Sequence, residues 1–252
     1  MRAHLLIDVP AMAVAISLMP TLGWPPVAGI GCAVSALHTW AVLDPRAALY
    51  GPVRWRLPAG SPGVALTFDD GPNPEVTPLV LDRLAAFGCK GTFFVIGEHV
   101  RKHPDLIRRM ASEGHAIGLH SDRHARSFPF WLPGRMVRDL RANAEAIAQI
   151  TGAPPPTLFR PPMGIKNPFV GHAATTLHLT TVTWTATGRD GVATTADRAF
   201  ARLLPALQPR SILVLHDGCE PGRPGDRSTC LAVLDRLLPE MNRRSLPGVV
   251  VG

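Results

Sequence analysis

The pattern of apolar and polar positions divides the chain into two parts. Two long apolar runs, residues 5–22 and 27–43, are separated by Gly23-Trp24-Pro25-Pro26. From Gly63 onward, short apolar runs alternate with amphipathic stretches. Because a glycine followed by two prolines is typical of a chain break, the first part is predicted to form two helices around a Trp-Pro-Pro turn.

Each apolar run is close to the shortest length that spans a bilayer as a helix, about 17 residues. Trp24 and Trp40 lie near the ends of the second run, where membrane interfaces favour tryptophan. We therefore interpret residues 1–45 as a membrane-associated helical hairpin and residues 46–62 as a linker. A helical pair buried against a soluble domain is the alternative.

A secretory signal peptide fits this segment poorly. Arg2 is the only charge of its n-region, Pro10 interrupts the apolar run, and no clear cleavage site follows. In a hairpin both ends lie on one side of the membrane. Because Arg46, Arg54 and Arg56 follow the second run, the positive-inside rule predicts that the next domain lies on the cytoplasmic side.

The alternating part, residues 63–252, is typical of an α/β domain. Strands are predicted at residues 64–68, 91–96, 115–119, 157–160, 180–185, 211–215 and 249–251. Helices are predicted at residues 76–87, 98–113, 134–150, 195–207 and 226–242. This alternation predicts a parallel sheet covered by helices, and seven or so repeats favour a closed barrel over an open sheet.

Composition and charge narrow the class of protein. Of 252 residues, 46% are hydrophobic and 18% are charged, which excludes a disordered chain and suffices for a core. The mean hydropathy of +0.13 is high for a soluble enzyme and suggests contact with lipid. The net charge is +7, but the arginines are scattered and no RNA-binding strand pattern occurs. We therefore expect a membrane surface as a partner and no nucleic acid.

Chemically reactive residue types follow directly after the predicted strands, and no nucleotide-binding glycine motif follows the first of them. In parallel barrels the active site lies at these carboxyl ends of the strands. The residues in these positions are Asp69 and Asp70, His120 and His124, Arg160, Arg189 and Asp190, and His216 and Asp217.

The spacing of His120 and His124 predicts a metal site. Residues four apart on a helical turn put two imidazoles on one face, where they can bind one ion. A carboxylate from another strand end would complete a set of two histidines and one carboxylate with open positions, as catalytic sites require. Since side chains alternate along a strand, Asp69 and Asp70 point differently, so one can bind the metal while the other faces water.

The same residues form motifs that resemble those of the NodB-homology polysaccharide deacetylases, carbohydrate esterase family four. Thr-Phe-Asp-Asp-Gly-Pro at 67–72 is similar to the first motif and His-Ser-Asp-Arg-His at 120–124 to the second. Arg-Pro-Pro-Met-Gly at 160–164, Asp190, and Leu-Val-Leu-His-Asp at 213–217 resemble the third, fourth and fifth. The resemblance covers residue 60 to the C-terminus and implies an irregular (β/α) barrel, usually with fewer than eight complete strands.

The resemblance also implies a ligand set for the metal. Asp70, His120 and His124 would bind a divalent ion, with zinc as the first candidate. That ion would lower the pKa of bound water and polarise the amide carbonyl.

The resemblance further implies the acid and base groups. Asp69 would be the general base, oriented by Arg160. His216 would be the general acid, and Asp190 would raise its proton affinity by adding negative charge.

Two further residues would face the substrate, and two positions depart from the family. The backbone N–H of Met163 would stabilise the oxyanion, and Val214 would line the pocket for the acetyl methyl group. The family often has an aromatic residue in place of Met163 and usually has tryptophan where Gly191 stands. Because these aromatic groups help to wall a sugar groove, their loss makes a lipid-linked amino sugar more plausible as substrate.

Together these features predict a membrane-associated, metal-dependent hydrolase that removes an N-acetyl group from an amino sugar. The substrate class is a polysaccharide, an oligosaccharide or a lipid-linked glycan. The alternatives are a deformylase or other amidase on a lipid-linked sugar, and a non-catalytic membrane-bound carbohydrate-binding module. A module without activity would be expected to have lost at least one of the motif residues.

Overall fold

The structure is a computed structural model of the chain. It describes residues 11, 13–14, 16–17, 19–21, 23–223 and 225–252. Most of the first predicted apolar run lies outside the described residues, and those described between 11 and 21 are helical. Whether the two runs form a hairpin therefore stays a prediction.

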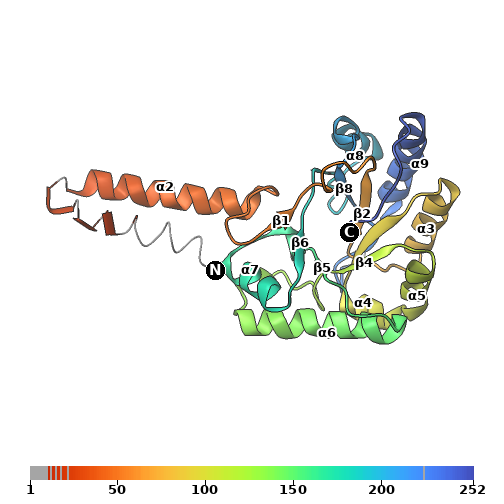
Figure 1. The fold of residues 1–252 in the computed structure, drawn as a ribbon, viewed down its shortest axis with the longest axis horizontal. Helices are drawn as coiled ribbons and strands as arrows, with labels where there is room; N and C mark the ends of the chain where they lie inside the picture. Colours follow the sequence, from red (N-terminus) through yellow and green to blue (C-terminus); the bar gives the residue numbers. More distant parts are fainter. Residues whose placement is uncertain (1–10, 12, 15, 18, 22, 224) are drawn as a thin grey trace.

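Helix α2, Trp24–Leu43, projects away from the rest of the protein (Figure 1). Of its side chains only Ala41 is buried, and by length and composition the helix could cross a membrane. The predicted Trp-Pro-Pro turn is wrong, because Pro25 and Pro26 occupy the first turn of α2. Proline is tolerated there since those N–H groups have no partner inside the helix. Gly23 precedes the first residue of α2 and is not helical; its φ of +69° favours glycine.

The remainder of the chain is built on one parallel sheet with the order β1-β6-β5-β4-β3-β2-β8-β7. The predicted parallel α/β architecture is confirmed. The strands are β1 Val53–Arg54, β2 Ala65–Asp69, β3 Gly91–Val95, β4 Ala116–Leu119, β5 Leu158–Phe159, β6 Thr180–Val182, β7 Ala186–Thr187 and β8 Ile212–His216.

A short segment of chain joins the two ends of the curved sheet. β6 pairs with β5 and β7 pairs with β8, yet only Thr183, Trp184 and Thr185 separate β6 from β7. The protein therefore forms an irregular barrel in which one bent segment joins the two ends of the curved sheet. Although β1 lies inside the predicted linker 46–62, it pairs with β6. The boundaries at residues 45 and 62 stay predictions.

Helices cover the outside of the sheet, with α6 along its lower edge in Figure 1 and α3, α5 and α9 on the side away from α2. Their bounds are α3 Thr77–Ala86, α4 Gly97–Lys102, α5 Pro104–Ser112, α6 Pro133–Thr151, α7 Pro168–Thr176, α8 Ala196–Leu203 and α9 Ser228–Arg243. Three short 3-10 turns are η1 Phe128–Phe130, η2 Pro162–Gly164 and η3 Leu204–Ala206.

Three predicted elements differ in the structure. The helix predicted at 98–113 is two helices, because Pro104 has no N–H to continue α4 and instead begins α5. The helix predicted at 195–207 ends as α8 at Leu203 and continues only as η3. The strand predicted at 249–251 is absent, and there the N–H of Val251 donates to the Thr92 hydroxyl.

Side chains along β2 point alternately to the two faces of the sheet, so one strand contributes to both the apolar core and the candidate site. Leu66 and Phe68 belong to the large apolar cluster between sheet and helices, whereas Ala65 belongs to a smaller cluster with Val182 and Ile212. Side chains at alternate positions point to the same face of a strand. Thr67 and Asp69 therefore share the face of Ala65, and the last residue of β2 carries a carboxylate toward the barrel interior.

Candidate active site and metal centre

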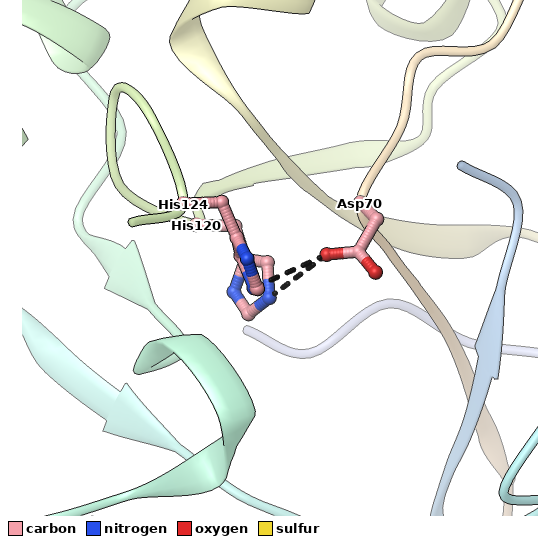
Figure 2. Close-up of side chains that lie close together, drawn as sticks. All are labelled: Asp70, His120 and His124. Atoms are coloured by element: carbon pink, nitrogen blue, oxygen red, sulfur yellow. Dashed lines mark ion pairs between the residues drawn. The ribbon is translucent and has the colours of Figure 1, made fainter. Parts of the chain in front are cut away.

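Asp70, His120 and His124 lie together as the sequence predicts (Figure 2). Both imidazoles point toward one carboxylate oxygen, with Nε2 of His120 at 3.4 Å and Nε2 of His124 at 3.3 Å from Oδ1 of Asp70. All three side chains are buried. Their ligand atoms lie within 4.8 Å of one another, which matches the two-histidine, one-carboxylate set.

The backbone that carries these groups is locally strained. Asp70 has a φ of +69° and His124 a φ of +48°, in the left-handed region that non-glycine residues rarely adopt. Such strain costs about 1 to 3 kcal/mol per residue and clusters at functional sites. Ser121, with a φ of +65°, stabilises the turn because its Oγ accepts the backbone N–H of His124 at 2.7 Å.

Hydrogen bonding and burial set the protonation of this cluster so that its groups can bind a cation. Nδ1 of His120 lies 2.8 Å from the carbonyl oxygen of Arg160, so the ring donates there and its Nε2 keeps a free lone pair. Burial, with help from the charge of His120, lowers the pKa of His124 to about 4, which keeps that ring neutral near pH 7. Burial opposes ionisation of Asp70, but its close contact with His120 and the charges of the nearby histidines hold its pKa well below the usual range.

These donors fit a divalent ion. Oδ1 of Asp70 is buried and makes no hydrogen bond, although it faces two imidazole nitrogens. An orphaned carboxylate oxygen between two ring nitrogens is costly without a ligand. Two neutral imidazoles and one carboxylate suit zinc, while the ion's identity is not fixed by the donors.

Asp69 lies beside the cluster in a buried ion pair with Arg160. Nη1 of Arg160 donates to Oδ1 of Asp69 at 2.6 Å and to the hydroxyl of Thr67 at 2.8 Å. The guanidinium also donates to the carbonyl of Thr183 at 3.0 Å and stacks on the Phe94 ring at 4.1 Å. These contacts hold the carboxylate of Asp69 in one orientation. The family resemblance implies such an orienting contact from Arg160.

His216 and Asp190 form the second predicted pair. Nδ1 of His216 lies 2.9 Å from Oδ1 of Asp190, and the backbone N–H of His216 donates to Oδ2 at 2.9 Å. Burial disfavours the charged ring, but the hydrogen bond and charge of Asp190 outweigh it and raise the pKa of His216 to about 9. The register of β2 and β8 places Asp69 opposite His216, so these two side chains flank one pocket.

The pocket between these groups has a volume of about 290 Å³. Both predicted substrate-facing residues, Met163 and Val214, line it. Met163 is 42% exposed and has a φ of +58°. Arg160 and Asp190 lie behind the pocket and act on it through Asp69 and His216.

Several lining residues escaped the sequence analysis. Trp184, Val192 and Glu220 line the same pocket, together with Arg189, which the sequence analysis had placed after a strand. The predicted strand at 180–185 includes Trp184, whereas β6 ends at Val182, so only the earlier end of the strand brings Trp184 to the site. Glu220 and Val192 lie in irregular loops that carry no periodicity.

Comparison with known proteins decides the family. The sequence model for polysaccharide deacetylases matches residues 56–182. The chain belongs to the polysaccharide deacetylase family. It is 36% identical to a chitooligosaccharide deacetylase from Bradyrhizobium sp. (strain ANU 289) over 74% of this chain and 87% of that one. It is 32% identical to a peptidoglycan-N-acetylglucosamine deacetylase from Bacillus cereus over 80% of this chain and 92% of that one.

Solved structures give the same result for the fold. A crystal structure of a peptidoglycan N-acetylglucosamine deacetylase matches with a TM-score of 0.72 at 28% identity, covering 79% of this chain and 90% of that one. The irregular (β/α) barrel is therefore the family fold, and this deacetylase is a hydrolase of amide carbon–nitrogen bonds. A Bacillus anthracis protein described as a carbohydrate esterase family four pseudoenzyme also matches, with a TM-score of 0.68 at 20% identity and coverage of 78% and 66%. That likeness shows the fold alone.

Proposed function

We propose that this deacetylase removes the N-acetyl group from an amino sugar carried on a lipid at a membrane surface. The observation that carries the proposal is one small pocket that joins a buried Asp-His-His cluster to two positioned acid–base pairs. This full set of groups supports catalysis over the alternative of a non-catalytic binding module.

The chain's own residues supply binding, orientation and proton transfer. Asp70, His120 and His124 would hold the divalent ion. When bound, that ion supplies Lewis-acid chemistry, polarising the amide carbonyl and lowering the pKa of water. Asp69, fixed by Arg160, takes the proton of the attacking water as general base.

His216 is the general acid in this proposal. Its raised pKa keeps the ring protonated near pH 7, so Nε2 can protonate the departing amine while Nδ1 stays bonded to Asp190. The backbone N–H of Met163 stabilises the oxyanion, and Val214 packs against the acetyl methyl group.

The lipid-linked part of the proposal rests on the edge of the pocket. Gly191 and Met163 stand at motif positions where the family often has aromatic residues, and the pocket is small. Phe130 and Leu132, in the loop after the second motif, are 82% and 71% exposed. Exposed apolar groups in this loop, together with a helix long enough to span a membrane, favour a substrate at the bilayer.

Acetate release from acetylated amino sugars tests the chemistry. The detergent-solubilised, zinc-loaded full chain is expected to release acetate from N-acetylglucosamine derivatives and to lose activity with a chelator. Release of formate alone, from N-formyl sugars, would establish the deformylase alternative. No release from any acyl sugar would overturn the enzymatic proposal.

Cell fractionation and topology tests address location. We expect the protein to remain in membranes after a carbonate wash because α2 crosses the bilayer. Arg46, Arg54 and Arg56 favour a cytoplasmic catalytic domain by the positive-inside rule. Protection of the barrel from protease in intact spheroplasts would agree with that side, and cleavage there would contradict it.

A further inference from the structure

A groove of about 420 Å³ lies between the end of α2 and the catalytic pocket. Trp40, Leu43 and Arg46 line one side of it, and Trp184 lines the other. Trp184 also lines the catalytic pocket, so this residue borders both spaces. The groove therefore adjoins the end of α2 on one side and the residue that borders the catalytic pocket on the other.

Hydrogen bonds on both sides of Trp184 fix the width of this groove. The hydroxyl of Thr183 donates to the carbonyl of Pro45 at 2.7 Å, and that of Thr185 donates to the carbonyl of Trp55 at 3.0 Å. The chain segment after α2 is thus fastened directly to the segment that carries Trp184.

A buried lysine fastens the same segment from a second direction. Nζ of Lys166, which is 5% exposed, donates to the carbonyls of Asp44 at 2.5 Å and Ala47 at 2.9 Å. Lys166 lies two residues after η2, so the end of α2 is joined to the loop of Met163. The groove is a built feature that holds the end of α2 at the edge of the active site.

The lining chemistry matches a lipid that carries an anion. Trp40 and Leu43, on the last turn of α2, are 51% and 67% exposed. Arg46 is exposed and stacks on the Trp55 ring at 5.1 Å, and in the described part of the chain no carboxylate lies within ion-pair distance of its guanidinium. The acidic group nearby, Asp44, accepts the indole N–H of Trp40 and the backbone N–H of Arg46, so both oxygens are engaged.

We propose that this groove binds the phosphate of a lipid-linked amino sugar. Arg46 binds the phosphate, because a guanidinium offers paired donors to phosphate oxygens. The lipid chain runs along Trp40 and Leu43 toward the bilayer, and the sugar passes Trp184 into the catalytic pocket. This inference rests on the proposed function and specifies its substrate class as a glycosyl phosphate on a lipid.

Three probes with the same sugar separate the contributions. N-acetylglucosamine is joined to farnesyl through a phosphate, to farnesyl as a glycoside without phosphate, and to methyl through a phosphate. With the full chain in detergent, the lowest KM is expected for the farnesyl phosphate probe. Loss of the phosphate is expected to raise KM about tenfold, the equivalent of one charge-assisted hydrogen bond. Loss of the farnesyl chain is expected to raise KM at least about tenfold, because its apolar surface no longer leaves water. Equal KM values for all three probes would overturn the proposal.

Substitutions assign the effects to residues. Arg46→Gln is expected to raise KM about tenfold for both phosphate probes, with kcat and the phosphate-free glycoside unchanged. Leu43→Ser is expected to raise KM only for the two farnesyl probes. The matched control is Arg141→Gln, an exposed arginine on α6 outside the groove, which is expected to change nothing. Equal slowing of all probes by Arg46→Gln would show a structural role and overturn the assignment.

Competition distinguishes a lipid-borne phosphate from a free one. Farnesyl phosphate is expected to bind the full chain in calorimetry, and Arg46→Gln is expected to weaken that binding about tenfold. Inorganic phosphate that competes equally well would overturn the lipid assignment. Calorimetry requires no turnover, so a protein that binds farnesyl phosphate but releases no acetate retains the groove and refutes the proposed function. A protein that hydrolyses the phosphate-free glycoside but fails to bind farnesyl phosphate refutes only the groove.

Discussion

The interior of the catalytic pocket and its outer edge follow different rules. In the interior, Asp69, Asp70 and Arg160 are almost fully buried; Asp69 pairs with Arg160, and Asp70 faces two imidazoles. At the edge, Met163 and Val192 line the pocket and are exposed and apolar. Removing one partner of a buried pair leaves the other charge uncompensated at a cost of about 3 to 5 kcal/mol, whereas exposed positions tolerate change. Under the proposed function, the chemistry therefore depends on positions where single changes are costly, and substrate choice depends on positions where they are tolerated.

The largest effect is expected from removing an interior metal ligand. His120→Ala is expected to lose the bound divalent ion and all measurable turnover, because two ligands hold the ion too weakly. Elemental analysis of the purified protein gives the metal content. His178→Ala, an exposed histidine outside the cluster, is the control. A full complement of metal in His120→Ala would place the ion elsewhere.

A smaller effect is expected from Asp69→Asn, which separates acid–base chemistry from metal binding. The amide keeps the size of the side chain but cannot accept a proton from water. We expect kcat to fall about 10² to 10⁴-fold with the metal content unchanged. Thermal unfolding, measured in parallel, reports any cost of leaving Arg160 with a neutral partner. Turnover at the wild-type rate would remove Asp69 from the role of base.

A shift in pH dependence is expected from Asp190→Asn. The pKa of His216 is raised to about 9 from an ordinary value of 6.5, so the protonated ring predominates up to about pH 9. Its contribution to folding stability is complete below pH 6.5 and is lost as the pH rises through about 9. Without the charge of Asp190, the basic limb of the profile of kcat/KM against pH is expected to move from about 9 toward 6.5 or below. An unmoved basic limb would assign it to another group.

The smallest effect is expected in the exposed loop after the second motif. Phe130→Ser combined with Leu132→Ser is expected to raise KM severalfold for a substrate embedded in vesicles, because serine removes apolar surface that would contact lipid. A water-soluble acetylated sugar is expected to be unaffected. Phe87→Ser, an exposed phenylalanine at the end of α3, is the control. Equal KM changes for both substrates would show that the loop does not contact lipid.

The sequence predicted most of the interior and little of the edge, for a physical reason. Asp70, His120 and Arg160 follow buried strands, and the carboxyl ends of parallel strands meet at one edge of a sheet. Their convergence could thus be inferred from strand order alone. Glu220 and Val192 reach the pocket from irregular loops, whose paths depend on tertiary contacts that no local pattern encodes.

The missed elements have the same explanation at the level of the fold. β1 and β7 contain two residues each, which is too short to show an alternation of apolar and polar positions. α7 begins with Asn167 as its N-cap, but the helix is rich in small residues and shows no clear amphipathic pattern. Pro104 is a sequence signal for the end of a helix, but the amphipathic pattern continues across it. The pattern therefore predicts one helix where the structure has α4 and α5.

Gly191 keeps a space open beside the proposed general acid. A Cβ atom at this position would lie 2.8 Å from Nε2 of His216, and Asp190 holds that residue at both the backbone N–H and Nδ1. A side chain at position 191 would therefore require the His216 ring to shift. Substitution of Gly191 alone is thus expected to disturb His216 as well as to add a wall to the pocket.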